Sequence, residues 1–186
     1  MKQYYFISGL PRSGSTLLSA ILKQNPEFYA DISSPVESLA GSSIDVITGS
    51  EHNVIVTENQ RKNLLYGIFD GYYQHIEKPV IFDTSRKWTR KTNLLQTLFP
   101  YTKILCPVRD IVSILNSFEV LFNKNCFYTK QINEQVFSNS IYLRIQEIFE
   151  RGLDNCHANL QEGYAFNPEM ICFIEYENLC KEPEKT

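Results

Sequence analysis

Long apolar stretches are missing from this sequence. None of its 186 residues lie in an apolar run of the roughly 18 residues that a membrane span needs, and no basic segment precedes an apolar one at the N-terminus. Strong charge is missing too, since the formal net charge is -3. We therefore expect a cytoplasmic protein with neither a membrane nor a nucleic acid as partner, in which any anion site is local.

Cysteine pairs of the C-x-x-C kind are also absent. The five cysteines, at positions 106, 126, 156, 172 and 180, are odd in number and scattered. This pattern excludes a zinc site of that kind and disfavours a disulfide framework, so we expect reduced, mostly buried thiols and no metal. The length and the hydrophobic content of 43% suit one domain over residues 1–186 with a core of its own.

The clearest pattern that is present lies between Gln3 and Leu22. An apolar, aromatic and β-branched run ends at Gly9 and predicts a buried strand. A loop rich in Gly, Ser and Pro follows, and apolar residues at helical spacing come after it, namely Leu17, Leu18, Ile21 and Leu22. In a strand, turn and helix of this kind, the free N–H groups at the helix start can hold a phosphate.

The loop matches only the first part of the nucleotide-binding P-loop pattern. Gly9-x-x-x-x-Gly14 is followed by Ser15 and Thr16 without the usual Lys, and Arg12 is the only cation in the loop. The missing Lys argues against ATP, because a P-loop kinase needs it on the β- and γ-phosphates. The loop suits a single phosphate-like group without a metal, and the alternative is a joint that binds nothing.

Residues 10–18, Leu-Pro-Arg-Ser-Gly-Ser-Thr-Leu-Leu, resemble the 5′-phosphosulfate loop of the sulfotransferases, which use 3′-phosphoadenosine 5′-phosphosulfate (PAPS). The likeness is closest to the branch that includes tyrosylprotein sulfotransferases and many bacterial members. It implies that the 5′-phosphosulfate is held by Arg12, Ser13, Gly14, Ser15 and Thr16. It also places Arg12 where charge builds on the leaving phosphate oxygen.

A second match follows the strand expected at residues 102–108. In the family, an Arg at a strand end and a Ser eight residues later bind the 3′-phosphate, and here these are Arg109 and Ser117. Arginine offers phosphate a fork of donors, and eight residues span just over two helical turns, so both lie on roughly one face. In the alternative, Asp110 caps the helix and Arg109 pairs with a surface carboxylate.

Two further residues are catalytic candidates by resemblance. Residues 27–50 are rich in Ser, Gly and Asp and predict mostly loop, with a short helix near residues 37–39. The tyrosylprotein branch has a glutamate base in this segment, which implies that Glu37 is the base here, whereas the alternative is a solvent-facing side chain.

The strand expected from residue 79 runs into Asp83-Thr84-Ser85-Arg86, where the family often has Asp-Lys-Ser/Thr-Pro. We expect these residues to face the same crevice as Arg12, with the second cation moved to Arg86. Alternatively, Asp83 or Ser85 caps the next helix.

The rest of the chain predicts structure more than chemistry. Thr57 and Gln60 form a capping box ahead of a helix, and another helix should run from about residue 89 to 99, with Trp88 packed in the core. Residues 132–160 predict one long helix or two, with a break at Gly152, and residues 170–177 a last strand. We expect an α/β, P-loop-like three-layer sandwich with a mainly parallel sheet of four or five strands flanked by helices.

The expected function is transfer of a sulfuryl group from PAPS to a hydroxyl or amine acceptor, which is a small molecule or a peptide. The product would be adenosine 3′,5′-bisphosphate, no metal is needed, and a homodimer stays open. The family has more helix and a basic, Gly-containing loop after the point where this sequence stops, so we expect its C-terminal part to be lacking. The alternatives are a degenerate P-loop nucleotide kinase or NTPase, with Asp83 as metal ligand, or a non-catalytic nucleotide-binding module.

Overall fold

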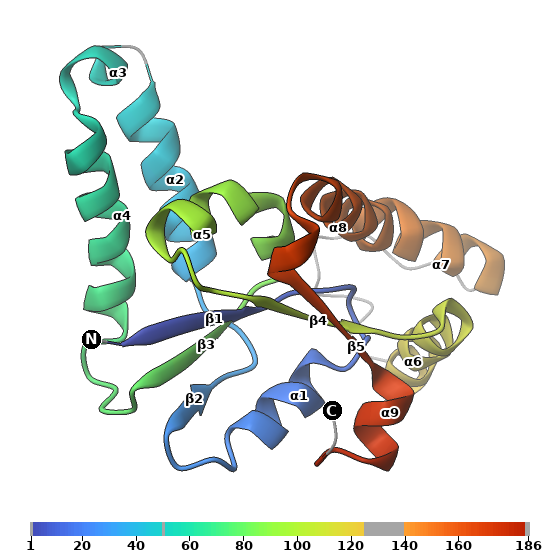
Figure 1. Ribbon diagram of the computed structural model, residues 1–186. Coiled ribbons are helices and arrows are strands. Elements are labelled where there is room, and N and C mark those ends of the chain that lie inside the picture. The colour runs from blue at the N-terminus through green and yellow to red at the C-terminus, as the bar shows by residue number, and fades with distance from the viewer. Residues whose placement is uncertain (1, 50, 125–139, 185–186) are drawn as a thin grey trace.

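The computed structural model describes residues 2–49, 51–124 and 140–184 and centres on one five-stranded sheet. All strand pairs are parallel, in the order β2-β3-β1-β4-β5 (Figure 1). The strands are β1 (Gln3–Ile7), β2 (Phe28–Ala30), β3 (Val80–Thr84), β4 (Ile104–Val108) and β5 (Ile171–Glu175). The four strands expected from the sequence are confirmed, and β2 is the one that the sequence analysis did not predict.

Helices cover both faces of the sheet. Figure 1 shows α1 (Ser15–Leu22) and α9 (Tyr176–Lys181) below it, with α2 (Val36–Thr48), α4 (Glu58–Tyr72) and α5 (Thr92–Leu98) above it. Alternating residues of β1 serve the two layers: Tyr4 and Phe6 pack in the upper core, and Ile7 in the lower one. This is the three-layer α/β sandwich that the sequence predicts.

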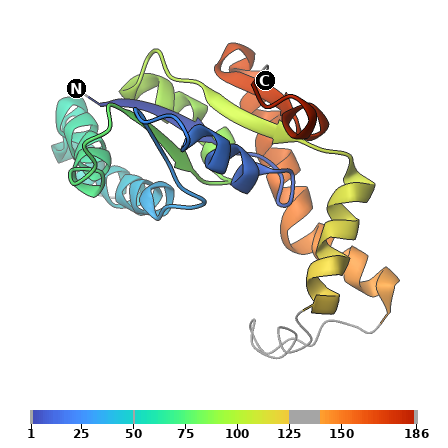
Figure 2. The same ribbon diagram turned by 90° about the horizontal axis from the view of Figure 1, so that it is seen from below.

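The remaining helical segments lie above the sheet or extend beyond its edge. They are α3 (His52–Ile55), the 3-10 segments η1 (Trp88–Lys91) and η4 (Pro168–Met170), α6 (Ile111–Lys124), α7 (Ile141–Ile148), the π-helical η3 (Phe149–Leu153) and α8 (Asp154–Phe166). Figure 2 shows α6 and α7 reaching beyond the sheet. Arg144 of α7 donates to Glu119 of α6 at 2.7 Å, which joins these two helices. None of the helices in the described ranges is long and apolar enough to cross a membrane.

The strand register brings four loops to one edge of the sheet. Ile7 lies beside Thr84 on one side and Leu105 on the other, so β1, β3 and β4 all run toward the same edge. Ala30 of β2 lies beside Phe82, so β2 points the same way. The segments that follow these strands therefore meet at the carboxyl edge, which is where open α/β sheets bind ligands.

The expectation of mostly loop in residues 27–50 is wrong. The segment forms β2 and the 13-residue helix α2. Val36, Ala40 and Ile47 of α2 are buried against the core, and this burial outweighs the weak helix propensity of the nearby Ser and Gly residues. The composition of the segment carried no sign of this packing.

Other local predictions are confirmed. Thr57 caps α4 in a capping box with Gln60. The helical run from residue 141 to 166 is interrupted by η3, which includes Gly152, whereas residues 132–139 of the predicted helix lie outside the described residues.

The expectation of mostly buried thiols is wrong for the described cysteines: Cys106 is buried, Cys156 and Cys172 are half-buried and Cys180 is exposed. Cys126 lies outside the described residues.

Candidate active site

The loop between β1 and α1 has the backbone of an anion cradle. Arg12 has φ +66° and Gly14 has φ +113°, so the chain turns twice through the left-handed region. The Ser13 hydroxyl donates to the Leu10 carbonyl at 2.7 Å, which closes the turn. Gly14 precedes α1 without a side-chain cap, and the first turn of α1 holds no acidic residue. The N–H groups at this helix start are therefore left for an anion.

Three residues that the sequence predicts to bind phosphate meet beside this loop. Arg12 Nε donates to Ser117 Oγ at 3.0 Å, and Arg109 Nη1 donates to the Arg12 carbonyl at 3.4 Å. Arg109 follows β4 and Ser117 lies on α6, so the carboxyl edge of the sheet gathers them. This edge thus combines two guanidinium groups with an uncapped helix start.

The guanidinium of Arg109 lies over the ring of Tyr176, the first residue of α9. The guanidinium carbon lies 4.1 Å from the centre of the tyrosine ring, and Arg109 Nε is buried without a hydrogen-bond partner among the described residues. The alternative of a surface carboxylate fails for the described part of the chain, where no acidic side chain pairs with Arg109. Asp110 does cap α6, because its carboxylate accepts from Ser113 N at 2.8 Å.

Tyr176 also packs against the loop between β1 and α1, residues 8–14, which we call the phosphate loop after its predicted ligand. The sequence analysis missed this contact, because it treated Tyr176 as part of a structural strand. A Cβ atom on Gly14 would lie 2.5 Å from the Tyr176 ring, so only glycine fits there. One ring therefore packs against both the loop and Arg109. Sequence could not reveal this, because 162 residues separate Gly14 from Tyr176.

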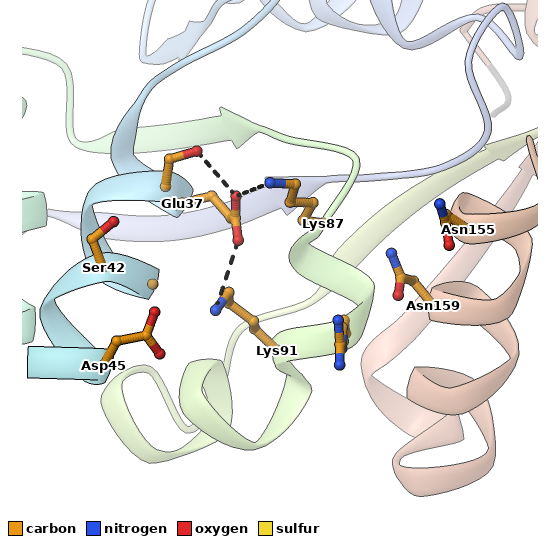
Figure 3. A pocket seen from close by; sticks show the side chains of 10 residues that line it. Glu37, Ser42, Asp45, Lys87, Lys91, Asn155 and Asn159 are labelled. Atoms are coloured by element: carbon orange, nitrogen blue, oxygen red, sulfur yellow. Dashed lines mark hydrogen bonds and ion pairs between the residues drawn. The ribbon is translucent and has the colours of Figure 1, made fainter. Parts of the chain in front are cut away.

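Glu37 is buried rather than solvent-facing, which overturns the alternative reading of this side chain. It lies in the first turn of α2 and is 4% exposed. Lys91 Nζ lies 3.7 Å from Oε1 and Lys87 Nζ lies 4.0 Å from Oε2 (Figure 3). Both lysines come from the η1 region, so this one segment brings two cations to the carboxylate on α2.

The segment ahead of α2 is fastened to the end of β3. Thr84 Oγ1 donates to the Asp31 carbonyl at 2.7 Å, and Ser34 N donates to the Thr84 carbonyl at 3.2 Å. Ser34 Oγ donates to Asp83 at 2.6 Å. These bonds place Glu37 at the same edge of the sheet as the phosphate loop.

Asp83 is the buried hub of this edge. It is fully buried and accepts hydrogen bonds from Ser34, from the Tyr73 hydroxyl at 2.6 Å and from Trp88 Nε1 at 2.7 Å. Burial raises the pKa of Asp83, against the three donors that lower it. The carboxylate oxygens are thus occupied by protein donors, which disfavours the metal-ligand role that a kinase would require. The predicted core position of Trp88 is confirmed.

No cluster of His, Cys, Asp and Glu suited to a metal ion occurs in the part of the chain that the structure describes. Arg86, the second cation expected in the same crevice as Arg12, is exposed. Burial raises the pKa of the Cys156 thiol, and the charge of Arg86 opposes that rise. Lys87 and Lys91 face Glu37 instead. The sequence shows Arg86 and Lys87 side by side, but only the turn into η1 decides which of them faces Glu37.

A polar pocket of about 750 Å³ opens beside Glu37, between α2, η1 and α8 (Figure 3). The residues that line it come from these three elements and their junctions: Glu37, Ser38, Gly41, Ser42, Asp45, Lys87, Arg90, Lys91, Asn155 and Asn159. A smaller cavity of about 290 Å³ joins the start of α8 to Leu10 of the phosphate loop. Helix α8 therefore borders both the loop and the Glu37 pocket.

Comparison of the sequence with models of protein families identifies the family of this chain. A model described as the sulfotransferase family matches residues 5–186. This chain belongs to the sulfotransferase family. Membership confirms the family that the motifs at residues 10–18 and 109–117 predicted, and it favours a sulfotransferase over a nucleotide kinase. Comparison with curated protein sequences gives no significant match.

Solved structures of bacterial sulfotransferases share the fold. The sulfotransferase domain from the curacin biosynthetic pathway is 17% identical, with a TM-score of 0.60 over 100% of this chain and 71% of that one. The domain from the Synechococcus PCC 7002 olefin synthase is 19% identical, with a TM-score of 0.57 over 100% and 70%. A sulfotransferase from Alicyclobacillus acidocaldarius is 15% identical, with a TM-score of 0.58 over 100% and 77%. At these identities the likeness establishes the fold alone.

Proposed function

We propose that this protein transfers a sulfuryl group from PAPS to the hydroxyl or amine of a small-molecule or peptide acceptor. The observation that carries the proposal is the convergence of Arg12, Arg109 and Ser117 beside the uncapped start of α1. Family membership supports the reaction class. The cytoplasmic location, the homodimer and the single-domain organisation stay predictions.

The residues present fit a nucleotide with phosphates at both ends. The loop residues Arg12 to Thr16 would hold the 5′-phosphosulfate with backbone N–H groups, hydroxyls and one guanidinium. Arg109 and Ser117 would hold the 3′-phosphate. The buried Arg109 Nε has no hydrogen-bond partner among the described residues, so it can donate to a phosphate oxygen. These two anion sites distinguish PAPS from ATP.

PAPS, when bound, supplies the sulfuryl group and a leaving phosphate. The acceptor oxygen forms a bond to sulfur while the bond between sulfur and the phosphate oxygen breaks. Glu37 takes the proton of the acceptor hydroxyl, as a buried carboxylate at the mouth of a pocket can do. Arg12 stabilises the negative charge left on the phosphate, and Lys87 and Lys91 hold Glu37 in place.

Calorimetric titration with adenosine 3′,5′-bisphosphate tests the donor site. Arg109→Ala should weaken binding by on the order of 2–5 kcal/mol, because it removes one partner of a desolvated charge pair. Arg61→Ala is the matched control: Arg61 lies on α4, where it pairs with Glu58, and its loss should leave binding unchanged. Equal affinity of parent and Arg109→Ala, or preference for ATP with Mg²⁺, would contradict the proposal.

A further inference from the structure

Every residue that lines the Glu37 pocket in the described part of the chain, except Gly41, carries a polar side chain. Its ten residues comprise two carboxylates, three cations, two hydroxyls, two amides and one glycine. Pockets of 300–1,000 Å³ for small molecules are lined mostly by apolar and aromatic side chains, so a pocket of about 750 Å³ with neither departs from the rule. An occupant of this pocket must bring hydrogen-bonding groups on most of its surface.

From this wall we infer that the acceptor is a polyhydroxylated, sugar-like molecule and not a flat aromatic alcohol. The inference rests on the proposed sulfotransfer and names the substrate class of that same site. A phenol or sterol would strip water from the pocket groups without replacing their hydrogen bonds, which costs free energy for each group left unpaired. A polyol exchanges those waters for its own hydroxyls.

The lysine ammonium groups beside Glu37 can still donate hydrogen bonds to a ligand. The ammonium groups of Lys87 and Lys91 lie 4.0 and 3.7 Å from the carboxylate, beyond the distance of a good hydrogen bond. Each ammonium can therefore still donate to an acceptor oxygen. Gly41 makes room for this arrangement, because a Cβ atom there would lie 3.3 Å from Lys91 Nζ.

Amide groups face this cluster across the pocket. Asn155 and Asn159 of α8 project toward the side on which Lys87 lies (Figure 3). An amide both donates and accepts, as does a sugar hydroxyl, so paired amides suit neighbouring hydroxyls of one ring. The arrangement places one hydroxyl at Glu37 for transfer and others on α8 for orientation.

Sulfate transfer from PAPS to a panel of acceptors tests the inference on the full chain. The panel holds maltose, lactose and myo-inositol as polyols, and cyclohexanol and 4-nitrophenol as acceptors with one hydroxyl. At least one polyol should show a kcat/KM at least about tenfold above both single-hydroxyl compounds, because a site built for hydrogen bonds rejects ligands that lack them.

Variants of α8 locate the effect. Asn155→Leu and Asn159→Leu should each lower kcat/KM for the preferred polyol about tenfold. They should leave the affinity for adenosine 3′,5′-bisphosphate unchanged. Gln161→Leu is the control, because Gln161 is exposed on the same helix and is not among the residues that line the pocket.

Equilibrium titration separates failure of this inference from failure of the proposed function. If the bisphosphate binds but 4-nitrophenol or cyclohexanol is preferred, the acceptor class is overturned and sulfotransfer stands. If the bisphosphate fails to bind while a polyol binds and loses affinity in Asn159→Leu, the pocket assignment stands and the proposed reaction falls. If no polyol binds saturably, the inference is overturned.

Discussion

Glu37 illustrates how a single residue acquires chemical meaning from its surroundings. In sequence it is one acidic residue in a polar segment, for which a catalytic and a solvent-facing reading are equally open. In the folded protein it is buried, and two lysine ammonium groups lie within 4.0 Å of it. A buried carboxylate beside a pocket is positioned for the general-base role that we propose.

Replacing Glu37 by Gln tests this role. The amide keeps the shape of the side chain but takes no proton, so we expect kcat to fall by about 10²-fold or more with little change in the affinity for adenosine 3′,5′-bisphosphate. Steady-state kinetics and calorimetry measure the two quantities. Glu58→Gln is the control, because Glu58 is an exposed residue of α4. Unchanged kcat in Glu37→Gln would remove the residue from the mechanism.

At the scale of elements, the contact between α8 and η1 positions both sides of the Glu37 pocket. The two segments touch at Gly163, where a Cβ atom would lie 1.9 Å from the Thr89 carbonyl oxygen. Thr89 N in turn donates to Ser8 Oγ at 3.4 Å, just ahead of the phosphate loop. The close approach of helix to backbone therefore ties the pocket to the end of β1.

Gly163→Ala should destabilise the protein by roughly 1–3 kcal/mol, because the added methyl group forces α8 away from Thr89. Urea unfolding monitored by circular dichroism gives the free energy. Gly67→Ala in α4 is the matched control: nothing lies within 4 Å of its Cβ position, so this change should leave stability equal or raise it by up to about 1 kcal/mol. Similar behaviour of the two variants would contradict the packing argument.

For the molecule as a whole, Asp83 links the sheet to three other parts of the chain. Its carboxylate on β3 holds Tyr73 after α4, Trp88 in η1 and Ser34 ahead of α2. Because burial raises its pKa in the native state, the native protein binds the proton more tightly than the unfolded chain does. The contribution of Asp83 to the free energy of unfolding must therefore decline as the pH rises above 3.8, the pKa of the group in the unfolded chain, toward the higher native pKa.

Asp83→Asn should remove that part of the pH dependence and lower the stability at every pH. The amide can accept from one side only, so at least one of the three buried donors loses its partner, which costs about 1–3 kcal/mol. The urea midpoints of the parent and of Asp83→Asn, measured from about pH 4 upward, report both the loss of stability and the loss of pH dependence. Asp70→Asn is the control, since Asp70 is exposed on α4. A parent and an Asp83→Asn variant with parallel pH profiles would contradict the raised pKa.

Sequence alone determined what depends on neighbours in the chain. Apolar runs predicted four strands, the Gly- and Ser-rich segment predicted the turn between β1 and α1, and Thr57 with Gln60 predicted the start of α4. The resemblance at residues 10–18 and 109–117 predicted the family. These patterns succeed because turn chemistry and hydrophobic period act over a few residues.

Tertiary structure decided what depends on distant contacts. Strand β2 is stabilised by its pairing with β3, and α2 is stabilised because Val36 and Ala40 are buried against the core. The approach of Lys87, and not Arg86, to Glu37 and the position of Arg109 over the Tyr176 ring follow from where η1 and α9 dock. Burial and charge pairing of this kind arise only after the sheet is assembled, because the partners are supplied by segments far apart in the chain.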